Sequence, residues 1–584
     1  MTLEGLKERI LAADGRKPAE LVIKNCKVVN VFTHEIESCD VAVSDGVIVG
    51  LGDYVGAEEV DAAGRYLLPG YIDSHIHIES SFLTPEEFGR MAVPHGATTV
   101  IADPHEIVNV CGMEGLDYMC AAAERTALDV RFMAPSCVPC TEWEDAGAVL
   151  DAADLREALN HRGVCGVGEF MNTAGVLSLE EPVLEKLLTT EGAHVDGHAP
   201  GLSGRALNAY LTTGVRTDHE SGSWEEALER LRRGVYVQLR YGSACHELPK
   251  LLKAVTPENA RRCLLCSDDR QAATLLERGE MDDQLRICVQ QGLDPITAVQ
   301  MATLNAAECY GLRDRGAIAP GRRADLVLVR DLRDFRADMV WIEGRLVASD
   351  GRYLLPVTRQ DPGKVASSIH VKDFSEERLK LRLRSGLVHV IDMSPGTVLS
   401  GDGCAEIART EDGDFRFDPK QDVVRISVIE RHHSTGKLAN ALLRGYGIRR
   451  GAVAVSVGHD SHNLLAVGPE TADMACAVEQ LMAQRGGVVL VLDGQVLERL
   501  PLPVAGLMSD CPAEEVRDAF ARLHRCAIEK LGVNPALEPI LSLCFMSLPV
   551  IPTLKLTDQG LFDVLSQKFI PLEWEETPEG NRDP

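Results

Sequence analysis

Two histidines, His75 and His77, close the apolar stretch YIDSHIHI and are the first residues in the chain that suggest metal chemistry. Alternate residues of a strand point to the same face, so both imidazoles can reach one point. Two imidazoles that meet at one point are a common arrangement of metal ligands. The Pro-Gly pair just before the stretch is typical of a tight turn that leads into a strand. The pattern therefore predicts a metal site at the end of this strand.

Four further side chains that can bind a metal occur in later strand-like stretches. Glu169 lies in GVGEF, His198 in HVDGHAP, His219 in VRTDHE and Asp268 in RCLLCSDD, each near the end of its stretch. Any one of them could cap a following helix or be an ordinary buried histidine. A series of such residues in chain order is hard to explain by those roles. We therefore predict one metal site from His75, His77, Glu169, His198, His219 and Asp268.

The region that must position these residues, 70–317, contains eight strand-like stretches that alternate with amphipathic ones. Besides those already quoted, the strand-like stretches are TTVIADP, VRFMAPS and VYVQLR. Eight strand–helix units in a segment of this length predict a TIM-like (β/α)8 barrel of the α/β class. Chemistry in such barrels lies at the carboxyl ends of the strands, where the candidate ligands occur.

The regions around the predicted barrel have different patterns. Residues 1–69 contain a predicted charged amphipathic N-terminal helix and short strands, and residues 318–360 repeat the short strands and glycine turns. We expect these two regions to form one discontinuous β-sandwich domain into which the barrel is inserted. Residues 365–584 contain strand-like segments such as DVVRISVIE and GGVVLVLDG between helical ones. They predict a separate C-terminal α/β or α+β domain.

The overall charge and composition narrow the classes of partner. The formal net charge is −28, and such a surface repels nucleic acid and anionic membranes. No apolar run is long enough to span a membrane, and the N-terminal stretch lacks the apolar core of a secretion signal. An odd number of scattered cysteines, 17, favours reduced thiols and a cytoplasmic location. We expect a small-molecule substrate and, most simply, a homodimer.

The order of the candidate ligands resembles that of the amidohydrolase superfamily. Within it, the stretches PGYIDSHIHIESS, ADPHEI, GVGEFMN, DGHAPGLSG, TDHE and CSDDR are similar to the adenine deaminases. The likeness continues through VIERHHSTGK, GHDSHN and SLPVIPTLKLTDQGLFDV, over nearly the whole chain. This resemblance implies hydrolytic deamination of adenine to hypoxanthine and ammonia in purine salvage, with adenine and water as substrates.

The resemblance also implies how two divalent metals would be bound. His75, His77 and Asp268 would bind one metal, and His198 and His219 would bind the other. Glu169 would bridge them, where many members of the superfamily use a carbamylated lysine. Mixed imidazole and carboxylate ligands suit manganese, iron or zinc. The resemblance favours Mn²⁺ or Fe²⁺ over Zn²⁺.

Two carboxylates are candidates for proton transfer. A metal lowers the pKa of bound water and so provides a hydroxide that can attack C6 of adenine. Asp268 is the candidate base that takes the hydroxide proton and returns it to the departing amine. Attack also places electrons on ring N1, and Glu79, just after the histidine pair, is the candidate acid. Glu79 could instead form a hydrogen bond with the backbone of the loop after the first strand.

Further polar residues could support this site. Asp103, His105 and Glu106 follow the second predicted strand and could orient ligands or hold substrate or a metal. Asp269 adjoins Asp268. His459 and His462, in GHDSHN of the C-terminal region, could cap the segment that follows or close over the barrel mouth and contact the purine; the additional candidates are thus Asp103, His105, Glu106, Asp269, His459 and His462.

Two other functions fit parts of the pattern. Another binuclear amidohydrolase would act on a cyclic amide or an N-acyl substrate, but cyclic-amide hydrolases usually carry lysine where this chain has Glu169. A non-catalytic barrel that serves as a binding scaffold would have lost ligands. This chain keeps each ligand that the resemblance implies.

Overall fold

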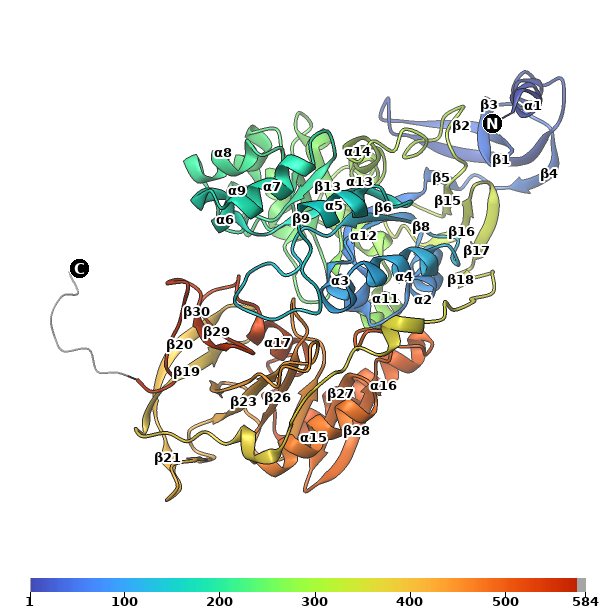
Figure 1. Ribbon diagram of the computed structural model, residues 1–584. Helices are drawn as coiled ribbons and strands as arrows, with labels where there is room; N and C mark the ends of the chain where they lie inside the picture. The colour runs from blue at the N-terminus through green and yellow to red at the C-terminus, as the bar shows by residue number, and fades with distance from the viewer. Residues whose placement is uncertain (1, 575–584) are drawn as a thin grey trace.

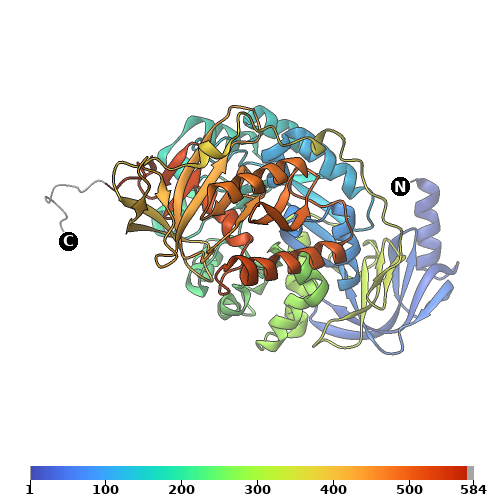
Figure 2. The same cartoon turned by 90° about the horizontal axis from the view of Figure 1, so that it is seen from below.

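The computed structural model describes residues 2–574, and the end of the predicted C-terminal domain, 575–584, lies outside the described residues. The chain forms a mixed α/β structure with three parts (Figure 1). A curled parallel sheet with surrounding helices lies between an N-terminal sheet and a C-terminal part (Figure 1). Turned by 90°, the molecule shows α1 (Leu3–Ala13) and the N-terminal sheet at one end, away from the last C-terminal strands (Figure 2).

The N-terminal sheet combines two distant segments of the chain. Its strands are β1 (Ala19–Asn30), β2 (Glu35–Ser44), β3 (Val47–Gly52), β4 (Gly56–Asp61), β5 (Tyr66–Pro69), β15 (Leu326–Val329), β16 (Ala337–Ile342), β17 (Arg345–Ser349) and β18 (Arg352–Tyr353). β5 pairs parallel with β1 on one side and antiparallel with β15 on the other. The predicted sandwich therefore takes the form of one hydrogen-bonded sheet, which encloses a core that includes Ile23, Val41, Leu328 and Trp341.

Each of the eight strand-like stretches of the central region contains a parallel strand. The strands are β6 (Tyr71–His77), β7 (Ala97–Ala102), β8 (Asp129–Ala134), β9 (Val164–Phe170), β10 (Val195–Gly197), β11 (Thr217–Asp218), β12 (Tyr236–Arg240), β13 (Cys263–Cys266) and β14 (Asp268–Asp269). β13 and β14 continue one another on either side of Ser267, and β14 pairs with β6, the first strand of the series. β7 is buried on both faces, which explains its continuous run of apolar and β-branched residues.

The parallel strands form two hydrogen-bonded groups. One has the order β10-β9-β8-β7-β6-β14 and the other β11-β12-β13. The two groups meet where the Arg216 amide donates to the Val195 carbonyl at 2.9 Å. The helices between and after the strands are α2 (Pro85–Ala92), α3 (His105–Cys111), α4 (Met113–Ala123), α5 (Ala152–Leu159), α6 (Thr173–Ser178), α7 (Glu181–Thr189), α8 (Gly204–Leu211), α9 (Trp224–Arg232), α10 (Leu248–Leu251), α11 (Ala272–Arg278), α12 (Met281–Gln290), α13 (Pro295–Met301) and α14 (Leu304–Cys309).

The C-terminal part is built on an eight-stranded sheet in the order β20-β19-β24-β23-β26-β25-β27-β28. These strands are β19 (Leu387–Met393), β20 (Ser400–Glu406), β23 (Val423–Ile429), β24 (Leu438–Arg444), β25 (Ala452–Val455), β26 (Leu464–Gly468), β27 (Gly487–Leu492) and β28 (Gln495–Pro501), with the short pair β21 (Ala408–Arg409) and β22 (Phe415–Arg416) beside them. The helices are α15 (Thr471–Ala483), α16 (Ala513–Cys526) and α17 (Leu541–Cys544), and a last small sheet contains β29 (Leu554–Thr557), β30 (Gly560–Asp563) and β31 (Lys568–Phe569).

The C-terminal part packs directly against the curled sheet and its helices. One apolar core contains residues of both parts, and the rings of Phe82 and Phe520 lie 5.8 Å apart across the contact. The Arg90 guanidinium adds an ion pair to Glu514. This contact positions loops of the C-terminal part next to the strand ends of the curled sheet. Among residues 2–574, the helices are too short or too polar to cross a bilayer.

Candidate metal centre and its cavity

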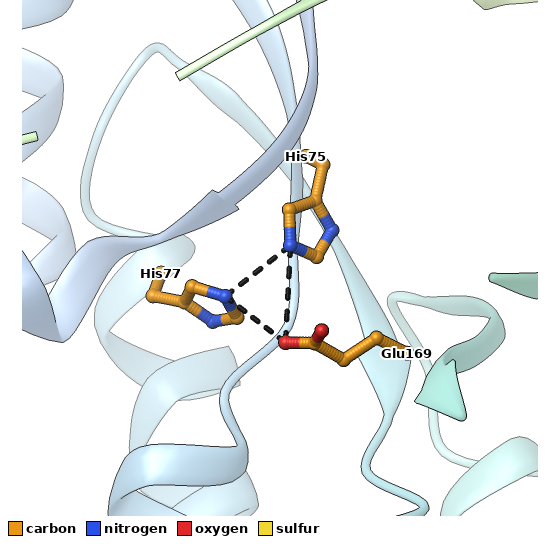
Figure 3. Close-up of side chains that lie close together, drawn as sticks. All are labelled: His75, His77 and Glu169. Carbon is orange, nitrogen blue, oxygen red and sulfur yellow. Dashed lines mark hydrogen bonds and ion pairs between the residues drawn. The ribbon is translucent and has the colours of Figure 1, made fainter. Parts of the chain in front are cut away.

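The histidine pair at the end of β6 faces a carboxylate from β9 (Figure 3). The two Nε2 atoms of His75 and His77 lie 3.2 Å apart. Glu169 Oε1 lies 3.2 Å from His77 Nε2 and 4.0 Å from His75 Nε2. All three side chains are at least 95% buried, so these polar atoms are removed from bulk water. Three donor atoms thus converge on one point, two of them from alternate residues of one strand.

Asp268 completes this first set of donors from the last strand of the curled sheet. Its Oδ1 lies 3.2 Å from His77 Nε2 and 3.8 Å from His75 Nε2. The backbone of Asp268 has φ of 59°, a left-handed conformation that is uncommon outside glycine. A costly backbone conformation at a candidate ligand is typical of functional sites. The first donor set is therefore His75, His77, Asp268 and Oε1 of Glu169.

The other oxygen of Glu169 faces a second set of donors. Oε2 lies 2.6 Å from His198 Nδ1 and 3.2 Å from His219 Nε2. Burial opposes ionisation of Glu169, but the neighbouring His198 and His219 hold its pKa well below the ordinary value. One buried carboxylate therefore directs one oxygen at each set of imidazoles.

The spacing of these donors fits divalent cations. Ligand atoms about 2.1 Å from one cation, at tetrahedral or octahedral angles, are separated by about 3.0–3.4 Å. The distances of 3.2 Å from His77 Nε2 to three other donors, and from Glu169 Oε2 to His219 Nε2, fall in this range. The imidazole and carboxylate donors also have the softness that manganese, iron and zinc share. The residues present therefore suit a site for divalent metal ions.

Asp103 holds two of these donors in place from the loop after β7. One of its carboxylate oxygens accepts a 2.9 Å hydrogen bond from the Glu169 amide. Its carbonyl lies 3.0 Å from His77 Nδ1, which leaves Nε2 free to face the cluster. His105 lies alongside, with Nδ1 at 3.7 Å from Glu169 Oε1 and 3.5 Å from Asp103 Oδ1. Asp103 thus contacts the backbone of Glu169 and the ring of His77, whereas His105 Nδ1 has no hydrogen-bond partner among the described residues.

Arg240 is a site residue that sequence reasoning missed. Its guanidinium donates to Asp268 Oδ2 at 2.8 Å and also pairs with Glu220, the residue after His219. The contact leaves Oδ1 of Asp268 directed at the histidines. Its position at the end of β12 was the signal that could have identified it, because site residues lie at strand ends and none was predicted for this strand.

Glu79 lies in the short turn after β6 and is almost completely buried. Its Oε1 accepts a 3.3 Å hydrogen bond from the Ile107 amide. Its Oε2 has no hydrogen-bond partner among the described residues. Burial raises the pKa of Glu79 to about 7. The backbone donor therefore belongs to α3 and not to the loop after the first strand, and one oxygen of Glu79 remains available for a second contact.

Glu106 is bound by both histidines of the C-terminal loop. His459 Nδ1 lies 2.7 Å from Glu106 Oε1, and His462 Nε2 contacts Oε2 even more closely. These separations suit direct hydrogen bonds. The loop therefore reaches the mouth of the curled sheet. Asp269 lies nearby and accepts a hydrogen bond from Ser80.

A cavity above the donors is lined by both parts of the protein. The floor includes His77, Glu169, His198, His219 and Asp268. An apolar surface from the C-terminal part, here called the roof, consists of Val398, Leu399, Phe545, Leu548, Val550, Ile551 and Pro552. Glu79, Glu106, Asp269 and His459 line an adjoining recess beside Phe545. A mostly apolar cavity with a few convergent polar groups is typical of small-molecule sites.

Comparisons with known proteins match this chain over almost its whole length. A model of the amidohydrolase family matches residues 66–347, and a model of the adenine deaminase C-terminal domain matches residues 402–568. "Adenine deaminase 2" of Desulfotalea psychrophila is 54% identical, over 98% of this chain and 100% of its own. "Adenine deaminase" of Ligilactobacillus salivarius is 47% identical, and that of Bacillus pumilus is 43% identical. Each match covers 98% of this chain and 100% of the relative.

Proposed function

The chain belongs to the adenine deaminase family of amidohydrolases, and we propose on this basis that it hydrolyses adenine to hypoxanthine and ammonia in purine salvage. The observation that carries the proposal is the pair of histidine-containing donor sets that share Glu169 beneath an apolar roof. The floor suits activation of water, and the roof suits a flat, largely apolar ring system. Both features are needed for a hydrolytic attack on a purine carbon.

The proposed ligands divide between two divalent cations. His75, His77 and Asp268 would hold one, His198 and His219 would hold the other, and Glu169 would bridge them. Mn²⁺ or Fe²⁺ is proposed in preference to Zn²⁺. When bound, these cations would lower the pKa of water and so supply a nucleophile at neutral pH.

Asp268 and Glu79 are proposed to move the protons of the reaction. Asp268 Oδ1 faces the histidines, so this carboxylate can accept the proton of the attacking water and return it to the departing amine. Arg240 fixes the orientation of Asp268 through the other oxygen. Glu79 would donate a proton to ring N1, since its unpartnered oxygen belongs to a residue that lines the recess.

The remaining candidates are proposed to hold the substrate or the ligands. Glu106, with His459 and His462, would contact the purine edge from the recess, and Asp269 would contribute there as well. Asp103 and His105 would orient Glu169 and His77. The contact of Glu106 with the C-terminal loop supports this division, because it joins the loop to the same cavity.

The finer architecture is also proposed. Residues 70–317 would form a closed (β/α)8 barrel, since β14 pairs with β6 and the amide of Arg216, just before β11, donates to Val195 of β10. Residues 1–69 with 318–360 would be one discontinuous domain, and residues 365–584 a third. We further propose a cytoplasmic homodimer, on the composition and symmetry arguments given above.

The test is adenine consumption, followed by ultraviolet absorbance, with the product identified as hypoxanthine. Protein reconstituted with Mn²⁺ or Fe²⁺ should turn over adenine, lose turnover with a chelator and recover it with added metal. No turnover of adenine by protein with full metal content would refute the proposed substrate. Cyclic amides would then be tested, because activity on hydantoin or dihydroorotate would support the alternative amidohydrolase reaction.

A further inference from the structure

Lys555 is a fully buried lysine of the C-terminal part that lies behind the roof. It belongs to β29, a strand of the small sheet that packs against the eight-stranded sheet. Within residues 2–574, no carboxylate forms an ion pair with its ammonium group, whose hydrogen-bond partners are carbonyls. A buried cation without a counter-ion destabilises a fold relative to an apolar side chain of similar length. Stability of the core therefore does not account for a lysine at this position.

The hydrogen bonds of Lys555 connect two separate segments of the roof. Nζ donates to the Val398 carbonyl at 3.1 Å and to the Phe545 carbonyl at 3.0 Å. Val398 precedes β20, whereas Phe545 begins the turn after α17, and both residues line the cavity. Hydrogen bonds from a charged donor are stronger than those between neutral groups. One ammonium group thus holds two loop segments that lie far apart in the chain.

Phe545 connects the segment that Lys555 holds to the polar recess. Its ring stacks on the ring of His459, with centroids 4.8 Å apart and planes 20° apart. His459 in turn binds Glu106. A shift of the Phe545 segment would therefore move both the apolar roof and the histidine that faces the recess.

We propose that Lys555 is a positioning residue that ties the Val398 and Phe545 segments together and thereby sets the affinity of the cavity for its purine substrate. The identity of that substrate rests on the function proposed above. Lys555 does not reach the reacting atoms, so it acts through the shape of the roof. Its loss is expected to weaken binding more than it slows the chemical step.

The test compares Lys555→Met with a matched control, Lys568→Met. Methionine has a similar length but cannot donate, and Lys568 is an exposed residue of β31 in the same small sheet. For Lys555→Met, KM for adenine should rise about tenfold, which corresponds to about 1.4 kcal/mol of binding, while kcat stays within about threefold of wild type. Hydrogen exchange should quicken in 396–400 and 545–552 without a fall in melting temperature. Lys568→Met should resemble wild type in each measurement.

Unchanged KM and unchanged exchange in Lys555→Met would overturn the proposal, as would a fall in kcat at constant KM. If Lys555→Met does not fold, Lys555→Gln replaces it. Its amide can donate to only one of the two carbonyls, so KM should rise by less than tenfold. Loss of folding in both variants would show a general core role and would also overturn the proposal. The exchange measurement needs no substrate, so it distinguishes a failure of the Lys555 proposal from a wrong substrate assignment.

Discussion

The replacement Glu169→Gln tests whether one side chain joins the two proposed metals. In the structure, Oε1 of Glu169 lies 3.2 Å from His77 Nε2, and Oε2 lies 3.2 Å from His219 Nε2. Glutamine has almost the same shape, but one of the two oxygens becomes an NH2 group that cannot bind a cation. One donor set must therefore lose its shared ligand, whichever way the amide turns.

The expected effect on metal binding is large. Removing a group that only orients a ligand already weakens metal affinity by about 10–100-fold. Loss of a ligand itself should cost at least about 100-fold, or about 2.7 kcal/mol. After reconstitution with Mn²⁺ and gel filtration, elemental analysis should find two metals per chain in the wild type and one in Glu169→Gln. A competition titration with a chelator would measure the loss of affinity directly.

The control is Glu185→Gln, which removes the same charge from an exposed position on α7. It should retain wild-type metal content, so a general effect of net charge can be excluded. Glu169→Gln that keeps both metals at wild-type affinity would refute the bridge. The donor distances would then need another explanation, such as a hydrogen-bonded cluster of imidazoles and carboxylates around a single cation.

Four other predictions follow from the same contacts. Asp268→Asn should lower kcat by about 10²–10⁴-fold, because an amide cannot accept the proton, and near-normal turnover with an unchanged melting curve would exclude Asp268 as the base. Glu79→Gln should lower kcat by about 10²-fold with metal content retained, and a wild-type rate would remove Glu79 as the acid. Arg240→Lys keeps the charge but not the planar fork, so kcat should fall about tenfold at constant metal content; an equal fall in an exposed control, Arg205→Lys, would show that the effect is not specific. Burial lowers the pKa of Lys555 to about 7, whereas the unfolded chain has a value near 10.5 and so binds more protons between these pH values. The unfolding free energy of wild type relative to Lys555→Met should therefore rise with pH across this window, and denaturant titrations that show no such difference would contradict the shift.

The convergence of the candidate ligands at one edge of the curled sheet could be anticipated because local rules determine it. Strand alternation places His75 and His77 on one face, and parallel strands bring the later strand ends to the same edge of the sheet. The order of the strands then brings Glu169 and Asp268 into contact with the first pair. These inferences need only the period of a strand and the topology of repeated strand–helix units.

The contacts that sequence reasoning missed depend on partners far away in the chain. In the sequence, Arg240 is an ordinary charged residue at a strand end. Its contact with Asp268 is known only from the folded structure. Glu106 and His462 are 356 positions apart, and no local pattern connects them. Lys555 lies in the alternating stretch TLKLT, where a lysine is expected on the exposed face. Its burial follows only from the packing of β29 against another sheet.

The floor and the roof of the cavity are consequently held in place in different ways. The floor is formed at strand ends, where fixed backbone positions hold donor atoms at the separations that a cation requires. The roof is formed by loops of the C-terminal part, which local strand geometry does not hold in place. A buried ammonium group between two loop carbonyls supplies that constraint at a cost in desolvation. Changes to the floor should therefore appear in metal content and kcat, whereas changes to the roof should appear in KM.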